Sequence, residues 1–269
     1  MKHALAVDGG NSKTDVAVVS SEGDVLGFAR GAASSPHHIG VEGTVEIVAE
    51  LIEEALGRPP GGRVADVAAL LMAGVDFPAE EDEVRAAVAA RGWADEIFVG
   101  NDTFAVLRAW TERGWGVAVV CGAGINCVGV APDGRHARFP ALGATTGDWG
   151  GGFDVGLAAT SAAARSEDGR GPATSLERLV PAHFGVGTPL ELAEEIHRGA
   201  ISMSRLEELP PVVFAAAGND AVAAQIVDRL ASEVVALSRV ALERLDLTEQ
   251  PVELLLGGGL LQAGASVPA

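Results

Sequence analysis

The sequence contains the same pattern twice: an apolar run, a glycine-rich turn and a second apolar run. Residues 4–7 lead into Asp8-Gly9-Gly10-Asn11-Ser12-Lys13-Thr14-Asp15, and the apolar residues 16–19 follow at once. Residues 117–120 lead likewise into Cys121-Gly122-Ala123-Gly124-Ile125-Asn126, and a second run ends at residue 130. Two strands around a short turn indicate a β-hairpin. The repetition predicts two similar lobes.

The glycine-rich turns have the composition of an anion-binding site. Adjacent glycines allow positive φ and leave backbone N–H groups uncovered. A row of such groups binds anions, and Lys13 together with the hydroxyls of Ser12 and Thr14 can extend the first site. We interpret the anion as a nucleotide phosphate. A strand follows the first loop, so it is neither a dinucleotide fingerprint nor a Walker A motif. An ordinary hairpin turn is the alternative for that loop alone.

Composition limits the class of protein and its partners. A chain of 269 residues with 48% hydrophobic content can form two α/β lobes with ample cores. A net charge of −18 argues against nucleic acid and anionic membranes as partners. We find no signal-peptide pattern at the start and no apolar run long enough to span a bilayer. The two cysteines, Cys121 and Cys127, are too few for a disulfide scaffold, so we expect a cytoplasmic protein.

Strands and helices are expected to alternate along the chain. The patterns predict further strands at residues 25–29, 67–72, 96–99 and 252–256. They predict helices at residues 41–56, 79–91, 103–113, 153–165 and over most of 174–246, the longest covering 220–245. This order favours an α/β fold with a mixed sheet in each lobe. We expect residues 1–114 to form the N-terminal lobe and residues 115–269 the C-terminal lobe, with the two hairpins facing a shared cleft.

A carboxylate follows the predicted strand at residues 96–99. Asn101 and Asp102 lie between that strand and the next helix, where open α/β sheets bind ligands. The alternative is that one of them only caps the helix. Another carboxylate, Asp148, lies in a glycine-rich segment.

His37 and His38 are adjacent in a loop and point in opposite directions, with no third metal ligand nearby in sequence, so we expect a loop or substrate contact there.

Together these motifs resemble the nucleotide-binding motifs of the actin, Hsp70 and sugar kinase superfamily. They most resemble the N-acetylglucosamine kinase branch, the BadF/BadG/BcrA/BcrD ATPase family. The matching segments occur in the family's order over nearly the whole chain, at residues 8–14, 121–126, 147–152 and 256–259. The resemblance implies a two-lobed ribonuclease H-like fold, as in actin-like ATPases. It also implies ATP- and Mg²⁺-dependent phosphorylation of a hexosamine-type sugar, such as N-acetylglucosamine or glucosamine.

The resemblance also implies a role for each motif residue. The phosphates would be bound by Gly9, Gly10, Asn11, Ser12 and Lys13 of the first loop and by Gly122, Ala123 and Gly124 of the second. Adenosine would lie on Gly257, Gly258 and Gly259. Asp8 and Asp148 would hold Mg²⁺ through water, and Asp102 would accept the proton of the sugar hydroxyl. The sugar-binding residues would be Ser35, His37, Asn101, Asn126 and Asp148.

The sequence departs from the family pattern near the sugar. Ser35 and His37 lie in the loop where the family usually has Asn, and Ala73 and Ala123 replace residues that commonly carry a hydroxyl. Trp149 follows Asp148 in place of an acidic residue. The chain ends ten residues after the last glycine motif, so a shortened C-terminal lobe is expected. The resemblance further makes a homodimer an expectation.

Two other functions remain open. The same family includes ATPase activators of dehydratases and reductases, which hold an iron–sulfur cluster between subunits through cysteines. Cys121 and Cys127 flank a loop that we expect to hold phosphate, so we expect two small buried thiols instead. A sugar sensor or regulatory nucleotide-binding module without catalysis is the other alternative. It stays open if Asp102 is only a helix cap.

Overall fold

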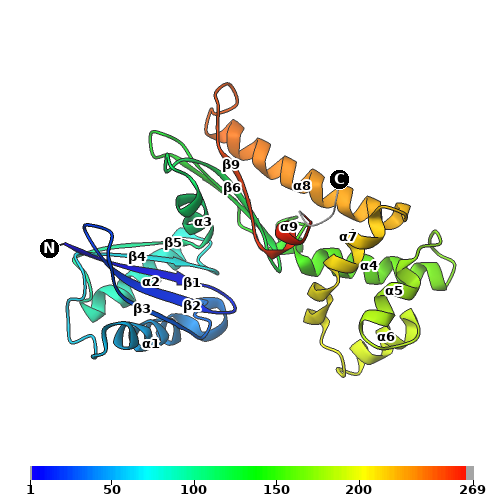
Figure 1. The fold of residues 1–269 in the computed structure, drawn as a ribbon, viewed down its shortest axis with the longest axis horizontal. Coiled ribbons are helices and arrows are strands. Elements are labelled where there is room, and N and C mark those ends of the chain that lie inside the picture. The colour runs from blue at the N-terminus through cyan, green and yellow to red at the C-terminus, as the bar shows by residue number, and fades with distance from the viewer. Residues whose placement is uncertain (1, 265–269) are drawn as a thin grey trace. The chain divides into compact units, whose positions relative to one another are not determined.

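The computed structural model describes residues 2–264 and divides the chain into two compact units (Figure 1). The units are Met1–Glu112 and Arg113–Ala269. Each has a sheet and a hydrophobic core of its own. Within the described residues, no helix combines the length and the apolar character needed to cross a membrane.

The first unit contains a five-stranded mixed sheet in the order β3-β2-β1-β4-β5. Its first three strands form an antiparallel meander: β1 (His3–Gly9), β2 (Thr14–Ser20) and β3 (Val25–Gly31). Then β4 (Val67–Met72) pairs in parallel with β1, and β5 (Glu96–Asn101) pairs in parallel with β4. The register aligns Gly9 with Met72 and Met72 with Asn101. The three parallel strands therefore end in one row.

Three helices complete the first unit: α1 (Pro36–Leu56), α2 (Pro78–Arg91) and α3 (Thr103–Trp110). Helix α1 packs against β2 and β3, and α2 packs against β5. Both helices begin with proline, whose missing N–H costs nothing in a first turn. Helix α1 starts earlier than the sequence predicts and is interrupted at Gly40, which has φ +73°. Helix α3 ends at Trp110 rather than at residue 113, because Thr111 adopts an extended backbone.

The sheet of the second unit repeats the beginning of this topology. Its order is β8-β7-β6-β9. Strands β6 (Gly116–Cys121), β7 (Ile125–Val130) and β8 (His136–Arg138) form an antiparallel meander, and β9 (Leu254–Gly257) pairs in parallel with β6. The repeat in the sequence therefore corresponds to a repeated arrangement of strands.

Helices form the rest of the second unit. They are α4 (Gly152–Glu167), α5 (Leu176–His183), α6 (Pro189–His197), α7 (Pro210–Ala217), α8 (Ala221–Arg244) and α9 (Gly259–Gly264), with short 3-10 turns η1 (Gly143–Thr145) and η2 (Met203–Glu208). Helix α8 packs on β6, β7 and β8. Its start is fixed by Asp220, whose side chain accepts hydrogen bonds from Val222 N and Ala223 N. Helix α4 packs against α5, α7 and η2.

The turn between β6 and β7 lies against the start of α4. Gly152 N donates to Gly122 O at 2.8 Å, and Phe153 N donates to Ala123 O at 3.1 Å. A Cβ atom on Gly151 would overlap the Ala123 carbonyl. Glycine is therefore required at position 151 because two backbone segments are in direct contact.

The turn after β9 approaches the same hairpin. Gly258 has φ +93°, and a Cβ atom there would overlap the backbone of Cys121, the last residue of β6. The glycine motifs at 122–124, 150–152 and 257–259 thus meet within the second unit. Close backbone packing accounts for glycine at positions 151 and 258, whereas a Cβ at Gly122, Gly124 or Gly259 would meet nothing within 4 Å.

We expect Gly151→Ala to destabilise the second unit. Overpacking of this kind typically costs about 1–3 kcal/mol, and each kcal/mol lowers the midpoint of a unit this size by roughly 2–4 °C. Gly122→Ala is the matched control, because a Cβ there meets nothing within 4 Å. Thermal unfolding followed by circular dichroism compares the two variants. Equal midpoints for both would contradict the packing argument.

Candidate active site

The parallel strands of the first unit bring three carboxylates to one edge of the sheet. Asp8 lies near the end of β1, Asp76 in the loop after β4, and Asp102 directly after β5. The charges of Asp8 and Asp76 both raise the pKa of Asp102, so the three groups are close enough to interact. Asp8 and Asp102 were expected here. Asp76 was not singled out, although its place after a strand of the same sheet is the signal that identified Asp102.

Asp102 is the most perturbed of these carboxylates. Burial is the largest cause, and the neighbouring Asp8 and Asp76 add to it, so that the pKa of Asp102 rises from 3.8 to about 6. Its side chain makes no capping hydrogen bond to α3. The cap is Asn101, whose Oδ1 accepts a hydrogen bond from Thr103 N at 2.9 Å. Asn101 therefore caps α3, and the Asp102 carboxylate also interacts with the Thr103 N–H, which lowers its pKa against the larger effect of burial.

Asp102 shares a cavity with the first hairpin turn. The cavity has a volume of about 410 Å³ and is lined by Asp8, the turn Gly10–Lys13, Asp102 and one side of α3. Trp110, at the end of α3, also lines it and is 74% exposed. The structure thus places a desolvated carboxylate and the glycine-rich turn beside the same space. Trp110 is a lining residue that the sequence analysis missed.

The turn is closed by a backbone hydrogen bond from Gly10 N to Lys13 O at 2.8 Å. The Lys13 ammonium lies 3.0 Å from Asp15 Oδ2, which is also bound by Arg30. The Arg30 guanidinium is the main reason that the pKa of Asp15 falls to about 2. The positive charge of Lys13 is therefore held at the turn and is partly balanced by an ionised carboxylate.

The hydroxyl of Thr14 does not extend the anion site, so this expectation is wrong. Thr14 is fully buried, and its Oγ1 donates to Ser34 Oγ at 2.7 Å. Thr44 donates to the Ser34 carbonyl oxygen at 2.9 Å. The alternation of side chains along β2 directs Thr14 into the protein. Ser12, at the exposed tip of the turn, remains able to contact a ligand.

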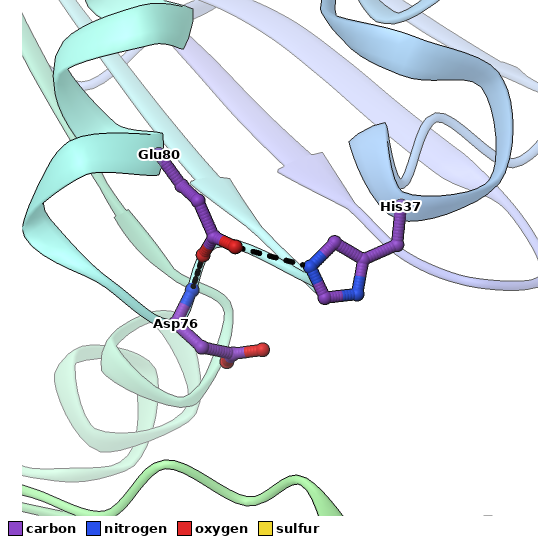
Figure 2. A group of neighbouring side chains, drawn as sticks. All are labelled: His37, Asp76 and Glu80. Carbon is purple, nitrogen blue, oxygen red and sulfur yellow. Dashed lines mark hydrogen bonds and ion pairs between the residues drawn. The ribbon is translucent and has the colours of Figure 1, made fainter.

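Ser35 and His37 lie together at the start of α1. Ser35 is 1% exposed, and its Oγ has no hydrogen-bond partner. The His37 ring bonds through Nε2 to Glu80 Oε1 at 3.2 Å (Figure 2). Gly74 faces both residues, since a Cβ there would lie 2.7 Å from Ser35 Oγ and 3.1 Å from His37 Cγ. A buried hydroxyl without a partner is uncommon and points to a ligand or water that binds there.

The predicted polar residues of the second unit are engaged locally. Asn126 Oδ1 accepts from Cys127 N at 2.7 Å. Asp148 accepts a hydrogen bond from the Thr146 hydroxyl and lines a small cavity of about 150 Å³ with Trp149. Asp8 and Asp148 belong to different units, so their joint coordination of Mg²⁺ stays a prediction.

An apolar cavity adjoins the predicted adenosine motif. It has a volume of about 500 Å³ and is lined by residues of α7, α8, β9 and α9, among them Leu256 and Leu260. These leucines flank the glycines at 257–259 in sequence. The cavity is large enough for a purine base, and adenosine binding by these glycines stays a prediction.

Both cysteines are part of the hydrophobic core of the second unit. Cys121 is 0% exposed and Cys127 is 1% exposed, and burial raises the pKa of each thiol to about 12. The expectation of two small buried thiols is confirmed. Burial of both thiols argues against their ligating a cluster shared between subunits.

This combination of two hairpin-based mixed sheets is the fold of actin-like ATPases and sugar kinases. The structure resembles that of a candidate N-acetylglucosamine kinase from Chromobacterium violaceum, with a TM-score of 0.76 and 24% identity over 98% of this chain and 89% of the other. A ROK family glucokinase from Streptomyces griseus, solved with glucose and AMPPNP, gives a TM-score of 0.53 and 18% identity over 98% and 87% of the two chains. The expected fold class is confirmed.

The chain belongs to the BadF/BadG/BcrA/BcrD ATPase family, whose model matches residues 5–269. It is 28% identical to the N-acetylmuramic acid/N-acetylglucosamine kinase of Clostridium acetobutylicum, over 97% of this chain and 86% of that protein. It is 25% identical to the N-acetyl-D-glucosamine kinase of Dictyostelium discoideum, over 65% of this chain and 58% of that protein. The family resemblance expected from the motifs is confirmed.

We expect Asp102→Asn to stabilise the protein at alkaline pH. Because the pKa of Asp102 is raised, ionisation of this side chain in the folded protein lowers the free energy of unfolding. The loss is complete above about pH 6 and nearly absent below pH 3.8. That cost is at most about 3 kcal/mol, reduced by the partial exposure of the side chain. Urea unfolding at several pH values between 8 and 4.5 measures the free energy of unfolding of Asp102→Asn and of the wild type. The difference in favour of the variant should shrink as the pH falls.

Asp24→Asn, in an exposed turn between β2 and β3, is the control and should show no such gain. An Asp102→Asn variant that is less stable than the wild type at pH 8 would contradict the desolvation of this carboxylate.

Proposed function

We propose that the protein is an ATP-dependent sugar kinase that transfers the γ-phosphoryl group to a hydroxyl of a hexosamine-type sugar, such as N-acetylglucosamine or glucosamine. The observation that carries the proposal is the buried Asp102 carboxylate in the same cavity as the Gly10–Lys13 turn. Two relatives that bear the names of N-acetylhexosamine kinases support the sugar class.

Asp102 takes the role of the base in this proposal. Phosphoryl transfer depends mainly on positioning and charge neutralisation, and a positioned base adds about 10²- to 10⁴-fold in rate. A base works best with a pKa near the operating pH, and burial brings the pKa of Asp102 to about 6. Asp102 then accepts the proton of the sugar hydroxyl as that oxygen attacks phosphorus.

The hairpins supply phosphate contacts through their backbone. In the first unit these come from the turn that contains Gly9, Gly10, Asn11, Ser12 and Lys13. In the second unit they come from Gly122, Ala123 and Gly124, with adenosine on Gly257–Gly259. Each unit thus contributes its own part of the nucleotide site.

Magnesium fits the donor set of the first unit. Asp8 offers hard oxygen ligands beside the cavity, and a nearby cation would relieve the repulsion that raises the pKa of Asp102. When bound, Mg²⁺ neutralises charge on the phosphates. We propose Asp8 and Asp148 as the residues that hold it through water.

The acceptor sugar is proposed to contact Ser35 and His37 of the first unit. The unpartnered Ser35 hydroxyl supports this role, because a sugar hydroxyl would satisfy it. Asn101, Asn126 and Asp148 are proposed as further contacts. We propose that the reaction takes place in the cytoplasm on a free sugar, and a homodimer stays a prediction from the family.

We expect one hexosamine-type sugar to stimulate ADP formation well above the ATPase activity without sugar. The panel comprises N-acetylglucosamine, N-acetylmuramic acid, glucosamine and glucose, each with ATP and Mg²⁺, and coupled ADP detection gives the rate. Asp102→Asn should lower kcat by about 10²- to 10⁴-fold and leave AMPPNP binding, measured by calorimetry, largely unchanged.

The sensor alternative gives a different result in this assay. A sensor would release ADP at the same rate in the wild type and in Asp102→Asn. A panel in which no sugar stimulates the wild type would end the kinase proposal.

A further inference from the structure

We propose that His37, Asp76 and Glu80 form a binding site for one divalent transition-metal ion such as Zn²⁺, separate from the Mg²⁺ that accompanies ATP. Each residue offers one ligand atom, and these atoms all lie within 4.8 Å of one another. His37 comes from the first turn of α1, Asp76 from the loop after β4, and Glu80 from the first turn of α2. Figure 2 shows the Glu80 carboxylate directed at the His37 ring, with the Asp76 side chain beside them.

The His37 and Glu80 donors already have the spacing of two ligands of one ion. Metal–ligand bonds of about 2.0–2.2 Å in tetrahedral geometry separate the donor atoms by roughly 3.3–3.6 Å. His37 Nε2 and Glu80 Oε1 are 3.2 Å apart. The Asp76 carboxylate needs to approach them by little more than about 1 Å to reach the same spacing.

The two carboxylates are held in place by other polar groups. Glu80 Oε2 accepts hydrogen bonds from Asp76 N at 2.7 Å and Phe77 N at 2.9 Å, which directs Oε1 towards His37. Asp76 Oδ1 accepts from Asn101 Nδ2 at 2.8 Å. Metal ligands are typically oriented by hydrogen bonds of this kind. Capping of α2 accounts for the position of Glu80, but it does not account for the histidine beside it.

The donor set selects the class of ion. One imidazole nitrogen with two carboxylates suits Zn²⁺, Mn²⁺ and related first-row ions, whereas Mg²⁺ and Ca²⁺ prefer oxygen ligands alone. Two carboxylates also balance the charge of a divalent ion. Three protein ligands leave one tetrahedral position for water.

Titration of the metal-stripped protein with Zn²⁺ tests the proposal, with excess Mg²⁺ present and neither ATP nor sugar added. Calorimetry should show one Zn²⁺ per chain, and His37→Gln should weaken its binding at least tenfold. His38→Gln is the matched control, because this exposed neighbour lies outside the cluster. It should bind Zn²⁺ as the wild type does.

Substitution with Co²⁺ gives a readout of the ligands themselves. The visible spectrum of the Co²⁺ protein should change in His37→Gln and stay the same in His38→Gln. Wild-type protein that binds no Zn²⁺, or equal binding by both histidine variants, would overturn the proposal. Neither result depends on whether the protein is a sugar kinase, and a thermal melt of His37→Gln checks that it is folded.

Discussion

Parallel pairing of β1, β4 and β5 is the constraint on which the candidate site depends. The register aligns Gly9, Met72 and Asn101 in one row, so the chain leaves all three strands at the same edge of the sheet. The residues that follow this row are the hairpin turn, the loop that carries Asp76, and Asp102. A carboxylate with a raised pKa therefore results from strand order, since three acidic side chains are carried to one partly dehydrated edge.

Parallel strand pairing also organises the second unit, where it brings backbone segments together and not carboxylates. Its β6 and β9 also run in parallel, with Val120 opposite Gly257, so the hairpin turn and the last glycine motif are brought together. Glycine is needed where these segments touch, because a Cβ at Gly151 or Gly258 would overlap a carbonyl group. The duplicated topology thus yields two different surfaces, one acidic and one made of closely packed backbone.

The sequence was sufficient to predict the hairpins, the order of most elements and the place of Asp102, because these depend on local alternation and on the position of a residue after a strand. It was not sufficient for contacts between distant segments. Thr14 was assigned to the anion site, but it points into the core to Ser34. The cluster of His37 with Asp76 and Glu80 was missed, because His37 is about forty positions from the other two residues and only the packing of α1 beside α2 brings it to them.

The central claim is that the Asp102 carboxylate accepts the proton of the acceptor hydroxyl. The most direct test is the pH dependence of kcat/KM, which reports ionisations of the enzyme before its substrates bind. A base must be deprotonated to act, so log kcat/KM should fall as the pH drops through about 6, and the residual activity of Asp102→Asn should lack this acid limb. The same acid limb in the variant, or a wild-type profile that is flat between pH 5 and 8, would contradict the account.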